Sequence, residues 1–277
     1  MCRNLISCLL LMCCFNQAGC SQDIEEPKEQ LPDNLVFIDE FETFNDKVWT
    51  KERHEPGWVN NELQEYRPEN VSVGTDQGKS VLIITAERKG NNIYSGRVNS
   101  QGKMNFRTGR IEASIKLPKT ANGLWPAFWM MGDNGKNWPT CGEIDILEMG
   151  EKQGILNGTS ESLVNVAIHY GEDYTSHRQE YFAKLLDHSL QDGEYHIYAL
   201  EKTANRLTIT IDGIEIRSFD ISPVSGRQEY FKDEYYALIN LAVGGNFPGI
   251  QDIDEITALP DDGKAYMYVD WIKVFDL

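Results

Sequence analysis

The feature that most constrains the fold is a succession of short runs rich in β-branched and aromatic residues, separated by turn-forming pairs. Residues 81–88 (VLIITAER), 109–117 (GRIEASIKL) and 266–275 (YMYVDWIKVF) alternate in part between apolar and polar side chains, as strands with one buried face do. Residues 207–216 (LTITIDGIEI) predict a hairpin with Asp-Gly at its turn. The pattern predicts one all-β domain, a sandwich or a barrel.

The charge of the chain narrows the class of partner. There are 26 Lys and Arg residues against 43 Asp and Glu residues, a formal net charge of −17. Nucleic acids and anionic lipid surfaces would be repelled, whereas a neutral polymer such as a polysaccharide would not.

Five of the six cysteines lie within the first twenty residues. Cys141 is therefore alone in the rest of the chain, which excludes a disulfide framework there and predicts a small buried side chain.

The N-terminus has the pattern of a targeting segment. Arg3 precedes a short apolar stretch, and Gln17-Ala18-Gly19-Cys20 follows it, which predicts a signal peptide over residues 1–19. A cysteine after Ala-Gly resembles the box at which bacterial lipoproteins are acylated, although Gln17 departs from the usual leucine. The expectation is therefore export, either as an outer-membrane lipoprotein anchored through Cys20 or as a secreted protein. Residues 20–33 are polar and acidic, as in a solvated tether, and residues 34–277 form the globular domain.

Three acidic residues lie in one apolar run, Cys141 to Gly150 (CGEIDILEMG). In a strand, residues two apart share a face, so Glu143 and Asp145 point the same way. Strict alternation would send Glu148 to the apolar face. One extra residue bulged out near Leu147 or Glu148 would bring Glu148 round to join the other two. Taken alone, the spacing also fits a solvated acidic face or a calcium site.

A row of carboxylates is what hydrolysis of a glycosidic bond requires. One acid must be ionised to attack the anomeric carbon, and another must carry a proton for the departing oxygen. The neighbouring motifs favour this interpretation, because they resemble glycoside hydrolase family 16, and its laminarinase branch in particular. They are WVNNELQEYRPENV (58–71), SGRVNSQGKMNFRTGRIEASIKLP (95–118), GLWPAFWMMG (123–132), NWPTCG (137–142) and LINLAVGGNFPG (238–249). The resemblance extends over residues 34–277.

This resemblance implies a jelly-roll β-sandwich of the concanavalin-like kind with a concave substrate cleft. It implies a retaining mechanism with Glu143 as nucleophile, Glu148 as general acid/base and Asp145 as the assisting carboxylate. Indole rings stack well on sugar faces, and the implied substrate-binding residues are Asn60, Arg97, Trp125, Trp129 and His169. His169 would lie on the leaving-group side, whereas His177 receives no role.

The implied activity is that of an endo-β-1,3-glucanase acting on laminarin, or on mixed β-1,3/1,4-glucan. No cofactor is expected for catalysis. Many similar enzymes hold a structural calcium ion away from the cleft, and Glu40 and Asp270 occupy the matching places. A monomer is expected. Two alternatives stay open: a hydrolase of agar or another algal galactan, and a non-catalytic glucan-binding sandwich.

Overall fold

The computed structural model describes residues 32–277, of which Asp33–Leu277 form one compact unit. The expected signal peptide, Cys20 and nearly all of the tether lie outside the described residues. Among the described residues, no helix has the length and apolar character that a membrane span needs.

Two large β-sheets pack face to face in a jelly-roll sandwich, as predicted. The ten-stranded sheet contains, in spatial order, β16 (Ile214–Asp220), β15 (Arg206–Ile211), β14 (His196–Lys202), β9 (Gly109–Lys116), β18 (Lys264–Phe275), β5 (Lys79–Lys89), β6 (Asn92–Ser95) and β3 (Gln64–Tyr66). Two further strands join this sheet, β1 (Leu35–Asp39) beside β18 and β4 (Val71–Asp76) beside β5.

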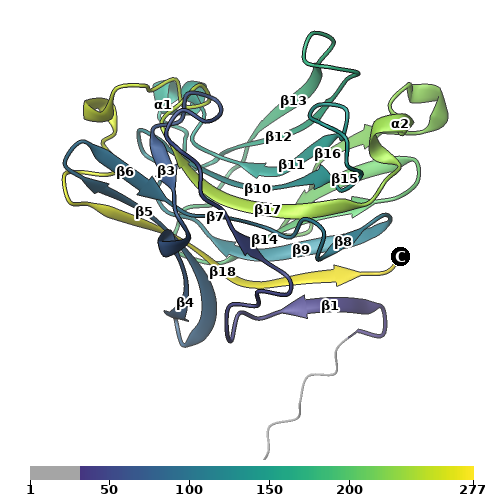
Figure 1. Cartoon of the computed structure of the whole chain (residues 1–277), viewed down its shortest axis with the longest axis horizontal. Coiled ribbons are helices and arrows are strands. Elements are labelled where there is room, and N and C mark those ends of the chain that lie inside the picture. The colour runs from purple at the N-terminus through teal and green to yellow at the C-terminus, as the bar shows by residue number, and fades with distance from the viewer. Residues whose placement is uncertain (1–31) are drawn as a thin grey trace, which may run out of the picture. The chain divides into compact units, whose positions relative to one another are not determined.

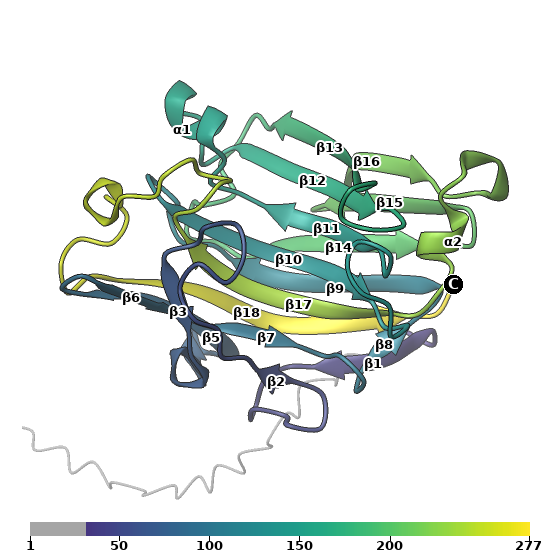
Figure 2. The same cartoon turned by 45° about the horizontal axis from the view of Figure 1, so that its top comes forward.

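The eight-stranded sheet contains, in order, β13 (Arg178–Leu185), β12 (Leu163–Tyr170), β11 (Glu143–Glu148), β10 (Leu124–Gly132), β17 (Tyr235–Val243), β7 (Arg97–Asn99) and β2 (Thr50–Lys51), with β8 (Asn105–Phe106) beside β17. Figure 2 shows β13, β12, β11, β10 and β17 side by side. The helices are short: α1 (Lys152–Asn157), α2 (Gln228–Phe231) and the 3₁₀ turns η1 (Pro68–Asn70), η2 (Pro223–Ser225) and η3 (Ile253–Glu255).

The runs singled out in the sequence are strands. Residues 81–88 lie within β5, residues 109–117 coincide with β9 to within one residue, and residues 266–275 lie within β18. The predicted hairpin is formed by β15 and β16. Asp212 and Gly213 at its turn have φ angles of 49° and 77°, the left-handed conformations of a two-residue hairpin turn.

Strand β10 shows how one sequence serves both faces of the eight-stranded sheet. Leu124, Phe128 and Met130 are fully buried in the core between the sheets. Trp125 and Trp129 alternate with them and are half-buried on the opposite face. That face is the inside of a curve: in Figure 1 the eight-stranded sheet rises toward β13 at one side, and β3 of the ten-stranded sheet stands at the opposite side. The strand thus delivers large aromatic rings to the concave face.

Candidate active site

A β-bulge in β11 brings the three acids to the concave face. Asp145 pairs with Trp129 of β10, but the next pair is Leu147 with Phe128, so Ile146 is the extra residue. Ile144, Ile146 and Leu147 are all fully buried in the core, which leaves Glu143, Asp145 and Glu148 on the other face. The predicted bulge is confirmed, one residue earlier than expected. It allows three apolar and three acidic side chains to occupy opposite faces of six residues.

Each outer acid receives a hydrogen bond from a tryptophan. The Trp138 indole Nε1 donates to Glu143 Oε2 at 3.0 Å, and the Trp125 Nε1 donates to Glu148 Oε1 at 3.1 Å. Trp125 also stacks on Phe247, with ring centroids 4.7 Å apart. An indole can donate but not accept. Each tryptophan therefore fixes one carboxyl oxygen while its ring covers that carboxyl from one side.

Burial raises the pKa values of all three carboxyls. The pKa of Glu143 is raised to about 8, first by burial and then by the negative charge of Asp145, while His169 and the Trp138 hydrogen bond act in the opposite direction. Burial likewise raises the pKa of Asp145. It raises the pKa of Glu148 well above its ordinary value, and the charge of Asp145 adds to the rise. Three like charges cannot all be present in so dry a place, so the cluster retains protons at neutral pH.

His169 lies beside the acids. It pairs across the strands with Glu143, and its Nε2 lies 3.2 Å from Asp145 Oδ2 and 3.6 Å from Glu143 Oε1. Asp145 Oδ2 is buried and accepts no directed hydrogen bond from any described residue. The approach of His169 is therefore electrostatic, and it acts to lower the pKa of Glu143 against the larger effect of burial.

The far nitrogen of His169 has its own partner. His169 Nδ1 lies 2.9 Å from His177 Nε2, and the two rings are parallel to within 2°. Trp138 lies over both rings, with its centroid 4.6 Å from that of His177. The exposed Tyr174 contacts the other side of Trp138 at 5.0 Å. These residues form a wall beside Glu143.

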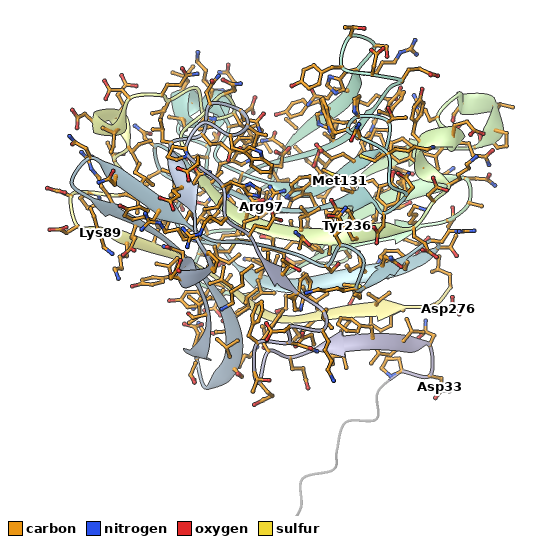
Figure 3. All side chains as sticks on the ribbon, in the orientation of Figure 1. Asp33, Lys89, Arg97, Met131, Tyr236 and Asp276 are labelled. Carbon is orange, nitrogen blue, oxygen red and sulfur yellow. The ribbon has the colours of Figure 1, made fainter. Side chains whose placement is uncertain are left out.

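The acids lie on the floor of an open cleft of about 970 Å³. In Figure 3, the labelled Arg97 and Met131 lie on the concave sheet between two raised masses of side chains. All eight residues predicted for catalysis and substrate binding line this one cleft: Asn60, Arg97, Trp125, Trp129, Glu143, Asp145, Glu148 and His169. The structure thus brings together residues that are up to 109 positions apart in the chain, from Asn60 to His169.

The predicted binding residues are held by different means. Arg97 is buried and donates from Nε to Glu52 Oε2 at 3.0 Å, with its guanidinium 4.8 Å from the Trp129 ring centroid. The Trp129 indole donates to Asn240 Oδ1 at 2.8 Å. Asn60 lies in a turn with φ of 53°, a left-handed conformation that asparagine tolerates. Arg97 and Trp129 are therefore rigid parts of the cleft, whereas Asn60 belongs to its rim.

Several cleft residues were missed by sequence reasoning. They are Trp58, Met131, Trp138, Tyr174, His177, Gln179, Asn240, Asn246 and Phe247. Trp138 could have been found, because it lies in the NWPTCG motif five residues before Glu143. His177 could not have been found from the sequence, because its contact with His169 depends on how the turn between β12 and β13 folds back.

The expected calcium residues fit a divalent cation poorly. Asp270 Oδ2 accepts a hydrogen bond from Lys79 Nζ at 2.6 Å, so an internal cation already neutralises this carboxylate. The Glu40 side chain is exposed, and the neighbouring Phe41 carbonyl accepts from Ser80 Oγ. A second positive charge would be repelled by the Lys79 ammonium. No chemical step is therefore assigned to calcium.

Cys141 is buried, as predicted.

Indole rings beside a cluster of acids suit a sugar polymer, because sugar faces stack on the rings while the glycosidic bond lies over the carboxyls. Fold and cleft together define a glycoside hydrolase of the β-sandwich type. Residues 59–272 match the sequence profile of Glycosyl hydrolases family 16, and the chain belongs to this family.

Three relatives show how far the similarity extends. One relative is a GH16 protein of a Bacteroides ovatus mixed linkage glucan PUL, whose structure was solved in complex with a G4G4G3G product. Its sequence is 58% identical to this chain, and the two structures superpose with a TM-score of 0.84 over 87% of this chain and 100% of that one. The clotting factor G alpha subunit of Tachypleus tridentatus is 32% identical over 98% of this chain. Glucan endo-1,3-beta-glucosidase A1 of Niallia circulans is 28% identical over 87% of this chain. The chain spans only 37% and 38% of the lengths of the latter two.

Proposed function

We propose that the protein is a retaining endo-β-glucanase that cleaves mixed β-1,3/1,4-glucan, and β-1,3-glucan as well, by double displacement. The observation that carries the proposal is the bulge at Ile146, which puts Glu143 and Glu148 on one face of β11 with an indole donor on each. The 58% identity to a protein solved with a mixed-linkage glucan product supports the mixed-linkage substrate. An open cleft suits attack within a long chain.

In the first step the Glu143 carboxylate attacks the anomeric carbon as the glycosidic C–O bond breaks. Glu148 gives its proton to the departing oxygen, and a glycosyl ester of Glu143 results. The elevated pKa of Glu148 keeps that proton available near neutral pH. His169 and the Trp138 N–H act against the burial that raises the pKa of Glu143, and so help to keep the nucleophile ionised.

In the second step water loses a proton to Glu148 and attacks the same carbon, which releases Glu143 and leaves the anomeric configuration unchanged. Asp145 lies between the two outer acids on the strand. Burial is the main cause of the raised pKa values of both neighbours, and the negative charge of Asp145 adds to its effect. The proposal therefore requires that the protons retained by the cluster leave Glu143 ionised for the attack and Glu148 protonated.

The test is release of reducing ends from mixed-linkage β-glucan, laminarin and agarose in parallel, with wild type, Glu143→Gln and Glu148→Gln. We expect both glucans to be cut, agarose to be left intact and each variant to lose at least about a hundredfold in kcat. Glu215→Gln, on the exposed face of the ten-stranded sheet, is the matched control and should keep full activity. Azide should rescue Glu148→Gln and yield a β-glycosyl azide.

Other outcomes identify the alternatives. Cleavage of agarose alone would point to a galactan hydrolase, and glucan binding without new reducing ends would point to a binding module. Full activity of Glu143→Gln would refute the assignment of the nucleophile.

We also propose that the protein is exported as a monomer, either secreted or anchored to the outer membrane through an acylated Cys20. The basic, apolar and small-residue pattern of residues 1–20 supports export. Incorporation of labelled palmitate into wild type but not into Cys20→Ser tests the anchor, and secretion without label would exclude it.

A further inference from the structure

His177 is the cleft histidine that the mechanism above does not use. Its Nε2 lies 2.9 Å from His169 Nδ1. The ring centroids are 5.1 Å apart with parallel planes, so the nitrogens are much closer than the ring centres and the contact is edge to edge. That geometry is an N–H···N hydrogen bond between two imidazoles. One proton occupies such a bond, so one of the two nitrogens must be bare.

The position of that proton decides what His169 presents to the acids. When His177 donates, His169 Nδ1 is the acceptor and its remaining proton lies on Nε2, facing Asp145 Oδ2 and Glu143 Oε1 at 3.2 and 3.6 Å. When His169 donates instead, a neutral His169 turns a bare nitrogen toward two carboxyls. That arrangement sets lone pairs against lone pairs unless one carboxyl is protonated. Asp145 Oδ2 has no hydrogen-bond donor among the described residues, so the first arrangement, which turns an N–H toward this oxygen, is the favourable one whenever the two carboxyls are ionised.

From this geometry we infer that His177 is a positioning residue for the proposed hydrolysis. It holds His169 in the tautomer whose Nε2 proton faces Glu143 and Asp145, and this N–H helps to keep the nucleophile ionised. The inference rests on the proposed function and assigns His177 no contact with the reacting atoms. A protonated His169 also fits, because it can donate from both nitrogens while His177 accepts. In either state, the pair keeps its proton at the end that faces the acids.

The surroundings of the pair contain few other charges. The groups that face it are the carboxyls of Glu143, Asp145 and Glu148 from β11, the uncharged Gln179 from β13, and the uncharged Trp138 and Tyr174 from two loops. Burial and the neighbouring His169 lower the pKa of His177. His177 is therefore neutral at neutral pH, as a hydrogen-bond partner of His169 should be.

The experiment compares the pH dependence of kcat/KM on mixed-linkage glucan for wild type, His177→Phe and His177→Gln. Phenylalanine keeps a flat ring beside Trp138 but has no nitrogen, whereas the glutamine amide can donate or accept. Without the His177 bond, the pKa of Glu143 should rise and the acid limb should move to higher pH. We expect a loss of about threefold to tenfold on the acid limb of His177→Phe, a shift of about 0.5–1 pH unit. The loss should be smallest at the optimum, and His177→Gln should restore most of the profile.

A purely structural or sugar-contacting role would give a different result. It would lower kcat/KM by the same factor at every pH, or raise KM without moving the acid limb, and either outcome would overturn the inference. His188→Phe, which alters a half-exposed histidine paired with Asp187, is the control and should leave the profile unchanged.

A second measurement does not depend on activity. The chain has five histidines, so ¹⁵N-histidine spectra of wild type and single variants can be assigned one by one. We expect the proton of His169 on Nε2 in wild type and a mixed or reversed tautomer in His177→Phe. A wild-type His169 that is neutral and protonated on Nδ1 would refute the inference even if the enzyme cleaves glucan. If no glucan is cleaved but the expected tautomer is found, only the proposed function fails.

Discussion

The two indole hydrogen bonds to the outer acids should control opposite limbs of the pH profile. Trp138 donates to Glu143 and Trp125 donates to Glu148, and each bond is stronger when its carboxyl is ionised. Replacing either tryptophan by phenylalanine removes the N–H and retains an aromatic ring, which can still pack on Tyr174 or on Phe247. Both substitutions should raise the pKa of the acid that loses its donor.

The sign of the effect differs because the two acids act in opposite protonation states. A higher pKa for Glu143 leaves the nucleophile protonated over more of the acidic range, so Trp138→Phe should move the acid limb up and narrow the profile. A higher pKa for Glu148 retains the catalytic proton to higher pH, so Trp125→Phe should move the alkaline limb up and broaden it. A hydrogen bond to a charged group contributes about 1.5 kcal/mol, which is about one pKa unit. Competition from water in the open cleft should reduce the shift to about 0.5–1 unit.

The assay is kcat/KM on mixed-linkage glucan from about pH 4 to pH 10, because this ratio follows the ionisations of the free enzyme. Thermal melting should first show that both variants are folded. If Trp125→Phe moved the acid limb and Trp138→Phe the alkaline one, the roles of Glu143 and Glu148 would be exchanged. If neither limb moved, the indole donors would have no part in tuning the acids.

Two further predictions concern stability. Lys202 is buried and donates to the carbonyls of Arg107 and Asp233, and burial lowers its pKa to about 8. Between pH 8 and 10.5 the unfolded chain binds a proton at this lysine that the folded chain lacks. The free energy of unfolding should therefore rise with pH in this range, by up to about 3 kcal/mol. Urea unfolding at pH 7 and pH 10 should show this slope in wild type relative to Lys202→Met, and equal slopes would contradict it. Because Lys79 already pairs with Asp270, calcium and EDTA should each change the wild-type melting temperature by less than about 1 °C. The Lys79→Ala variant, in contrast, should melt at a higher temperature in calcium than without it. If calcium stabilised the wild type by several degrees, calcium would displace Lys79 from Asp270.

Local sequence patterns were enough to predict the sheets and the acidic floor of the cleft. The alternation in residues 81–88, 109–117 and 266–275 indicated strands with one buried face, and the spacing of Glu143, Asp145 and Glu148 required a bulge because a regular strand would bury Glu148. The pattern could not place the bulge to the residue, since Ile146 and Leu147 are both apolar and both fit the core. The roles of the cleft residues came from a family resemblance and not from the pattern.

Contacts between distant segments were not predictable in the same way. Arg97 was expected in the cleft, but its partner Glu52 lies 45 residues earlier in the chain. His177 had no recognisable spacing to any other ligand or acid, and only the return of β13 alongside β12 sets it against His169. Lys79 and Asp270 lie 191 residues apart, so the competition with calcium also appears only in the folded chain.

The extra residue in β11 lets the strand lose one residue at this point but not gain one. Removing Ile146 would restore regular pairing with β10 and leave Glu148 on the cleft face, because Leu147 would take the single core position between Asp145 and Glu148. Inserting a residue before Glu148 would instead turn the Glu148 carboxyl toward the core, because the residues after the insertion would exchange faces. A strand transplanted into another sandwich could therefore carry one residue fewer between Asp145 and Glu148, and conservative changes within Ile144, Ile146 and Leu147, but no additional residue.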